Sequence, residues 1–294
     1  MADEPRTGSI YDLGYRRYEG VRLGREQTVL ALYIHSLRAC FGFGRRAQSK
    51  IIPIGLASLV FIPAAIQLGI AAILTEQFEV YTAVGYFTYT QSILGLFAAA
   101  VAPEMIGRDQ RNHTLSLYFS RALTRTDYAA AKIAAFVTAM LCLTLLPQVL
   151  LFVGGGMARN DLLDYFRDEY TQVPAIVTSS LMVSVVITLV ALPIAAQTSR
   201  RAYATGTILG VFVITSILGG VLSEVGSGGN NFMVLIAPFW ILRGFTYWVF
   251  GESANSFDPT TLADFPGFFY LLACLVVIGV GGYFFNRRIQ KVAA

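Results

Sequence analysis

Long apolar runs separated by short polar segments constrain the fold of this chain more than any other feature of its sequence. Hydrophobic residues make up 55% of the 294 residues and charged residues only 14%, far from the composition of an ordinary soluble domain. About 20 apolar residues suffice for one helical crossing of a bilayer. Six runs are therefore predicted to cross a membrane as α-helices: Ile51–Leu74, Val84–Ala102, Tyr128–Val153, Ala175–Gln197, Tyr203–Leu222 and Phe265–Phe285. The expected fold class is an all-α polytopic membrane protein with six transmembrane helices.

The basic residues indicate how these six runs are oriented. The chain carries 22 lysines and arginines and a formal net charge of +4. With both termini in the cytoplasm, 19 of the 22 fall in cytoplasmic segments, and Arg159, Arg167 and Arg243 fall in outer ones. Because positive charge usually concentrates on the cytoplasmic side, we expect both termini there. The charges flank apolar runs instead of forming one basic face, so no nucleic acid is expected as a partner.

The chain divides into two predicted units, a cytoplasmic N-terminal segment over residues 1–50 and a six-span domain over residues 51–294. The pattern over Val29–Phe43 predicts an amphipathic helix that lies along the cytoplasmic membrane surface. A helix packed into a small soluble domain is the alternative, which the scarcity of apolar sequence nearby disfavours. The apolar side chains of the helix recur at helical spacing at Leu30, Ile34, Leu37 and Phe41.

The segment before the last run is apolar enough over Phe232–Phe250 to resemble a further crossing. It contains Pro238, Arg243 and Gly244, and an arginine at the bilayer centre costs about 2.5–3.5 kcal/mol on insertion scales. A crossing here would also move the basic C-terminal residues to the outside, against the charge rule. We therefore predict a re-entrant pair of short helices in the outer leaflet. The aromatic residues expected near the interface are Trp240, Tyr247 and Trp248.

Motifs for catalysis are not found in the sequence. The three lysines follow Ser49, Ala131 and Gln290, so no Gly-Lys pair exists and a phosphate-binding P-loop is excluded. The two histidines are in no HExxH or triad-like setting, and the three cysteines form no CxxC. We expect no enzyme activity and no catalytic, cofactor-binding or metal-binding residues in this chain.

The predicted spans contain neutral polar residues and no interior acidic residue. Such residues either line a substrate path or form hydrogen bonds between helices, and the second interpretation is the simpler one. The glycine run Gly154–Gly156 is interpreted as a flexible end of the third span, and a short helix is expected in the acidic loop that follows. The candidate substrate-path residues are Gln67, Gln91, Gln148 and Ser184.

One polar segment, Pro103–Lys132, separates the second and third runs and has the composition of a docking site. It combines charged residues with a compact apolar group at its centre. The candidate docking residues are Glu104, Arg108, Thr114, Leu115, Leu117, Tyr118, Phe119, Ser120, Arg121 and Arg125.

The order of these features resembles the permease subunits of type-2 ABC exporters. That family has a surface helix, six spans, a re-entrant region before the last span, and a conserved pattern after the second span that forms a coupling helix. The sequence departs from the pattern at Ala122 and Leu123, where the family often has proline. Residues that match it in order are Glu104, Thr114, Leu115, Leu117, Ser120, Arg121, Thr124, Arg125 and Lys132.

The resemblance implies a membrane-spanning subunit of an ATP-driven exporter in a bacterial cytoplasmic membrane. ATP and Mg²⁺ would be bound by separate ABC ATPase subunits, and a second permease subunit, identical or homologous, would complete the transporter. The expected substrate is an apolar or amphipathic compound such as a drug, a lipid or a lipid-linked product. Two alternatives remain from the residues themselves: a nucleotide-independent channel or facilitator, and a membrane scaffold that does not transport.

Overall fold

The fold is all-helical in the part of the chain that this computed structural model describes. The described residues are 20, 24–44, 47–73, 82–112, 114–120, 123–158, 165, 167, 169–225, 231–254, 256 and 258–292. The long helices are α2 (Gln48–Ile73), α3 (Ala83–Arg111), α5 (Arg125–Ala158), α7 (Gln172–Gln197), α8 (Arg201–Val225) and α11 (Gly267–Val292). The shorter ones are α1 (Arg25–Cys40), α4 (Leu115–Phe119), the 3₁₀ helix η1 (Asn231–Leu235), α9 (Pro238–Phe250) and α10 (Pro259–Ala263).

Six helices among the described residues are long and apolar enough to cross a membrane. They coincide with the six predicted runs, which confirms the all-α class and the multi-pass membrane character. Several helices continue past the apolar run into polar sequence. In particular, α3 extends to Arg111 and α5 begins at Arg125, so both continue into the segment predicted to be a docking site.

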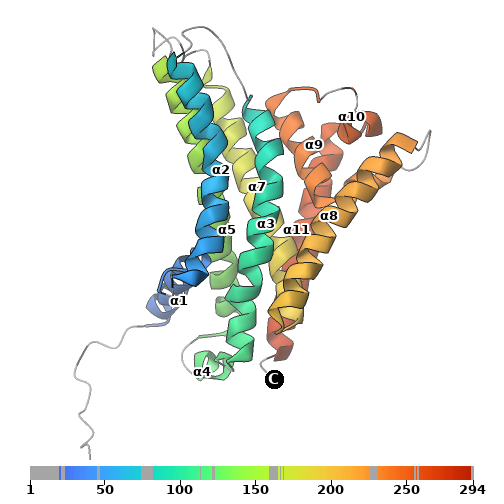
Figure 1. Cartoon of the computed structure of the whole chain (residues 1–294). Helices are drawn as coiled ribbons and strands as arrows, with labels where there is room; N and C mark the ends of the chain where they lie inside the picture. Colours follow the sequence, from blue (N-terminus) through green and yellow to red (C-terminus); the bar gives the residue numbers. More distant parts are fainter. Residues whose placement is uncertain are drawn as a thin grey trace, which may run out of the picture.

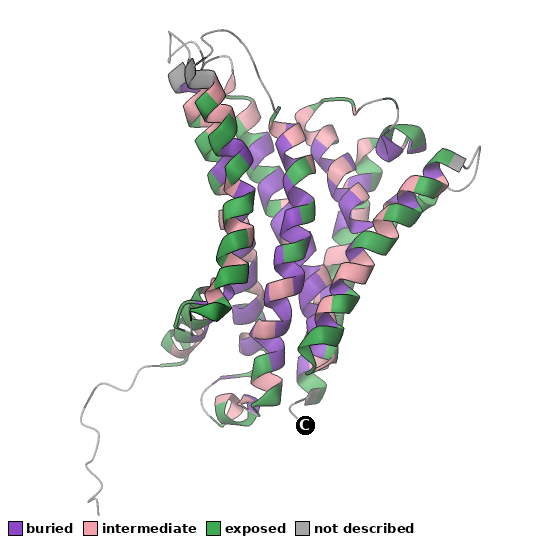
Figure 2. Ribbon diagram, viewed as in Figure 1, coloured by how far each residue is buried: buried purple, intermediate pink, exposed green. Residues whose placement is uncertain are grey.

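The helices differ in how much of their apolar surface the bundle covers. Within their apolar windows, 67% of residues are buried in α3 and α7, against 17% in α2 and α8. Figure 1 shows α3 and α7 in the middle of the bundle and α8 leaning outward at its edge, and Figure 2 shows exposed positions along much of α2 and α8. The exposed apolar side chains of these outer helices fit contact with lipid, because water would disfavour so large an apolar surface.

Helix α1 packs against the bundle as well as presenting an apolar face outward. Its buried residues are Leu32, Ser36 and Cys40, and it contacts mainly α5. Leu30 and Ile34 are exposed. The predicted stripe therefore divides, since Leu37 and Phe41 pack on the core while its first two members point away from it. The alternative of a helix packed into a small soluble domain was disfavoured because little apolar sequence lies nearby, and that argument overlooked α5, which begins a hundred residues after the start of α1.

Two glycines allow helices to approach closely. A Cβ on Gly281 of α11 would lie 2.1 Å from the backbone oxygen of Leu189 in α7, and a Cβ on Gly154 would lie 1.9 Å from a methyl carbon of Leu68 in α2. The run Gly154–Gly156 is helical and belongs to α5. The predicted end of the third span is therefore helical, and close packing against Leu68 accounts for Gly154. The flexibility expected of this end stays a prediction. The acidic loop that follows lies largely outside the described residues.

Short helices occupy the segment between α8 and α11. At 13 and 5 residues, α9 and α10 are too short to cross a bilayer as single helices. Figure 1 places α10 at the end of the bundle opposite α4. Arg243 in α9 forms an ion pair with Asp258, whose side chain is 2% exposed. The predicted re-entrant position of these helices in the outer leaflet stays a prediction.

Two of the four candidate substrate-path residues form bonds between helices. The Gln148 side-chain amide donates to the backbone oxygen of Ala83 at 2.9 Å, which joins α5 to the start of α3. The hydroxyl groups of Thr144 and Ser184 lie 3.2 Å apart and join α5 to α7. Gln91 is buried in α3 and Gln67 is half-buried in α2. For Gln148 and Ser184, these contacts agree with the simpler interpretation of helix-to-helix bonding.

Candidate functional site

Helix α4 connects α3 to α5 at one end of the bundle, where α11 also ends (Figure 1). Its start is fixed by Thr114, whose backbone N–H and hydroxyl both donate to the backbone oxygen of Asp109, at 3.1 and 3.2 Å. Leu115 is buried, whereas 66% of Leu117 is exposed. With only five residues, such a helix has little stability of its own, so its position depends on what it packs against.

The surface beneath α4 is the ring of Tyr128, a fully buried residue in the first turn of α5. The rings of Tyr118 and Phe119 lie 5.8 and 6.0 Å from the Tyr128 ring, centroid to centroid, in tilted and edge-on arrangements. These are favourable geometries for aromatic pairs. Burial, reinforced by the negative charge of Asp109, raises the pKa of the Tyr118 phenol, so this ring stays neutral at physiological pH.

A buried polar network lies behind the aromatic contacts. The Tyr128 hydroxyl donates to the Asp109 carboxylate at 2.6 Å. The Lys132 ammonium lies 2.8 Å from the same carboxylate oxygen and donates to the backbone oxygen of Met105 at 3.1 Å. Only 3% of the Lys132 side chain is exposed, and a buried ammonium needs such partners. The network joins the last turns of α3 to the first turns of α5, and Tyr128 in this network is the residue on which α4 packs.

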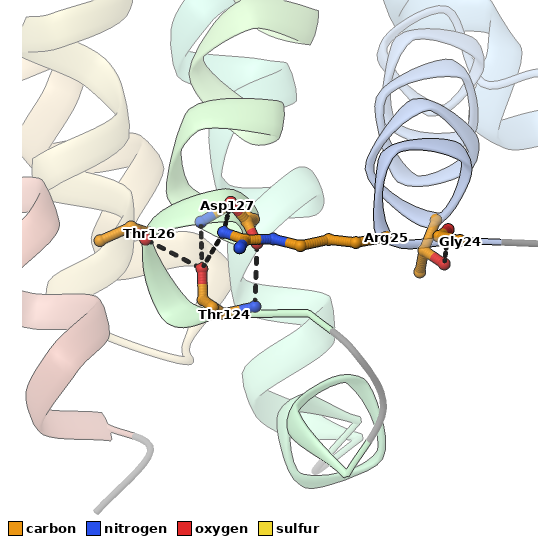
Figure 3. A network of polar contacts seen from close by, with 6 residues as sticks. Gly24, Arg25, Thr124, Thr126 and Asp127 are labelled. Atoms are coloured by element: carbon orange, nitrogen blue, oxygen red, sulfur yellow. Dashed lines mark hydrogen bonds and ion pairs between the residues drawn. The ribbon is translucent and has the colours of Figure 1, made fainter.

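A second network ties α1 to the start of α5, as Figure 3 shows. The Arg25 guanidinium donates to both carboxylate oxygens of Asp127, each at 2.8 Å. Asp127 also accepts from the backbone N–H of Thr124 at 3.1 Å, and its own N–H donates to the Thr124 hydroxyl at 3.2 Å. This reciprocal pair is a capping box with aspartate in the acidic position. One carboxylate therefore caps α5 and anchors α1.

Side chains from several helices bind free backbone carbonyls at this end of the bundle. The last carbonyls of a helix have no partner within it. The backbone oxygen of Ala196 near the end of α7 accepts from Gln110 at 3.0 Å and from Arg288 at 3.1 Å. Arg111 donates to Ser199, and Arg125 donates to Gln290 near the end of α11. These bonds join α3, α5, α7 and α11 to one another at the end of the bundle that carries α4.

The predicted docking residues have different positions in the structure. Leu117 and Ser120 are exposed and Arg108 is exposed on α3, whereas Leu115, Tyr118 and Phe119 attach α4 to the bundle. Glu104 forms an ion pair with Arg201 at 2.7 Å, which joins α3 to α8. Arg121 lies outside the described residues. Fewer than the ten predicted docking residues are therefore exposed and available to contact a partner.

Asp109 and Tyr128 were missed as members of this site. A tyrosine and a lysine four residues apart share one helix face, and Tyr128 and Lys132 have this spacing. Their common partner Asp109 could not be inferred, because it lies 19 residues before Tyr128 on another helix.

Comparison with known proteins assigns no family to the chain. No protein-family model matches the sequence, and no curated protein matches it either. Among the described residues, no group of three or more histidine, cysteine, aspartate or glutamate side chains is arranged to hold a metal ion. What the structure shows around α4 is a short helix whose Tyr118 and Phe119 rings pack on Tyr128 and whose Leu117 is exposed.

Proposed function

We propose that the chain is the membrane-spanning permease subunit of an ATP-driven exporter and that α4 is its contact with a separate ATPase subunit. The observation that carries this proposal is the attachment of α4. A surface loop with no partner has no need of two aromatic rings packed on a buried tyrosine, nor of a Lys–Asp–Tyr network behind that tyrosine. A helix that transmits force from a partner requires this rigid connection, because a flexible loop would absorb the displacement.

The proposed path of the movement follows the two networks. An ATPase that closes on ATP would displace α4 and, through Tyr128 and Asp109, the ends of α3 and α5. Arg25 and Asp127 would carry α1 with them. Since α3 is central and contacts α2, α7 and α8, rotation of its end would change the packing of the whole bundle between two states.

The partners follow from this mechanism. The ATPase subunits would supply the P-loop, ATP and Mg²⁺, and a second permease subunit would complete the pathway in a bacterial cytoplasmic membrane. The end of the bundle that carries α4 would face the cytoplasm. The uncharged interiors of the spans favour an apolar or amphipathic substrate, because a charged one would need ionic partners along its path.

The test is a single charge placed on the exposed edge of α4. Leu117→Asp leaves the buried contacts of Leu115 and Tyr118 intact, so the bundle should fold normally. A charge buried unpaired in an interface costs several kcal/mol, and we expect at least about tenfold less co-purification of a co-expressed ATPase from the same operon. The matched control is Leu262→Asp on α10, an exposed leucine at the opposite end of the bundle.

Two results would contradict the proposal. Unchanged co-purification of Leu117→Asp would remove α4 from the interface. Transport by the purified chain alone in liposomes, without nucleotide, would instead identify a channel or facilitator. If the proposal is correct, transport in liposomes requires both the ATPase and hydrolysable ATP.

A further inference from the structure

A cavity of about 660 Å³ lies beside the last turns of α3, and no residue of α4 lines it. It is bounded by the end of α1, the start of α2, the last turns of α3 and the first residue of α8. Four charged side chains line one part of it, namely Glu104, Arg108, Arg111 and Arg201. Apolar groups from Ile52, Ala100 and Val101 line another part. The cavity is thus amphipathic, since both charged and apolar side chains line it.

The charges within the cavity do not cancel. Glu104 is engaged by Arg201 at 2.7 Å. Arg108 and Arg111 are two further cations that line the cavity, and Arg111 also donates one N–H to the backbone oxygen of Ser199 at 2.9 Å. These two arginines lie one turn apart on α3 and are both exposed. Like charges at this helical spacing repel each other, and an anion placed between them would remove the repulsion. Guanidinium groups also bind phosphate oxygens in a bidentate manner.

The position of the cavity relative to the spans indicates what kind of anion it takes. Gln48 is the first residue of α2, Arg201 is the first of α8, and α3 changes from apolar to charged between Val101 and Arg108. The cavity therefore lies where apolar span becomes polar surface, the depth at which lipid headgroups lie. Basic pockets between transmembrane helices at this depth are suited to anionic headgroups.

We propose that this cavity binds one anionic phospholipid, with the phosphate held by Arg108 and Arg111. The glycerol and first acyl carbons contact Ile52 and Val101, two of the apolar residues that line the cavity. The site requires only that the chain spans a membrane and does not depend on ATPase docking. Because it contacts α1, α2, α3 and α8, a bound lipid connects the helices whose ends surround the cavity.

The experiment compares lipid retention by the purified full-length chain, using native mass spectrometry. Phosphatidylglycerol and phosphatidylcholine are added in equal amounts. We expect one phosphatidylglycerol to be retained in preference to phosphatidylcholine. The Arg108→Gln/Arg111→Gln double variant should lower that retention about tenfold or more, since each arginine near a membrane surface contributes measurably to anionic lipid binding. The matched control is Arg287→Gln, an exposed arginine on α11 that does not line the cavity.

Three outcomes would overturn the proposal. Unchanged retention in the double variant would show that the lipid binds elsewhere, and an equal loss in Arg287→Gln would show a general effect of surface charge. Displacement of phosphatidylglycerol by inorganic phosphate at millimolar concentration would identify a free anion as the ligand. Circular dichroism checks folding, and if the double variant does not fold, the exposed single variant Arg108→Gln replaces it, with the same direction of change expected.

Discussion

Among single residues, Arg243 has the least expected position. It lies in the middle of the apolar helix α9, where an isolated cation would be costly. The structure supplies Asp258 as its ion-pair partner, and the guanidinium also lies 5.4 Å from the Trp240 ring and 5.9 Å from the Tyr247 ring. Asp258 in turn accepts bonds from the backbone and hydroxyl of Thr260 at the start of α10. One buried carboxylate therefore holds α9 and α10 together.

Asp258→Asn is expected to lower the thermal stability of the purified protein. Removal of one partner from a buried pair costs about 3–5 kcal/mol, and we expect the lower end because 21% of the Arg243 side chain is exposed. Asp264→Asn, at an exposed carboxylate six residues later, is the control and should change little. In a double-mutant cycle, the loss of stability in the Arg243→Met/Asp258→Asn double variant should be smaller than the sum of the losses in the two single variants. Strict additivity would show that the pair contributes no coupling.

At the level of whole elements, the close contact between α7 and α11 depends on a glycine in α11, Gly281. A Cβ on Gly281 would lie 2.1 Å from the Leu189 backbone oxygen and 2.9 Å from its carbonyl carbon. Backbone atoms cannot rotate away as a side chain can, so the two helices would have to separate. Gly279 and Gly282, on the same helix, have no atom within 4 Å of the equivalent Cβ position.

Gly281→Ala is therefore expected to destabilise the protein, and Gly282→Ala is not. The alanine at 281 forces α11 away from α7, a strain typically costing about 1–3 kcal/mol. The alanine at 282 enters open space and should be neutral or stabilising by up to about 1 kcal/mol through helix propensity. Denaturation midpoints of both variants in the same detergent measure the difference. Equal midpoints would mean that the approach of the two helices is looser than described.

The helices were predictable from the sequence, but several contacts between them were not. The six spans were predicted because hydropathy depends only on local composition. Two tertiary contacts were not predicted, namely the ion pair of Arg243 with Asp258 and the packing of α4 on Tyr128. Each joins segments that are distant in sequence or separated by a turn. The buried face of α1 was missed for the same reason. Periodicity identified its apolar residues but not which of them would meet α5.

For the molecule as a whole, the distribution of charge implies an orientation in the membrane. Within the structure, α1 begins and α11 ends at the end of the bundle that carries α4, and α10 lies at the opposite end (Figure 1). The arginines that bind carbonyl groups gather at the α4 end. Since basic residues favour the cytoplasmic side, the α4 end should face the cytoplasm and α10 should face outward.

Single cysteines at the two ends test this orientation in intact cells. Leu117→Cys on α4 and Thr261→Cys on α10 both replace exposed residues, so neither should disturb the fold. A membrane-impermeant maleimide should label Thr261→Cys in intact cells that express the chain and Leu117→Cys only after the membrane is permeabilised. Labelling of the unsubstituted chain is the baseline and should be low, because Cys40 and Cys274 are buried and Cys142 lies within a span. The reverse pattern would place α4 outside, where no ATPase could reach it, and would contradict both the orientation and the proposed docking.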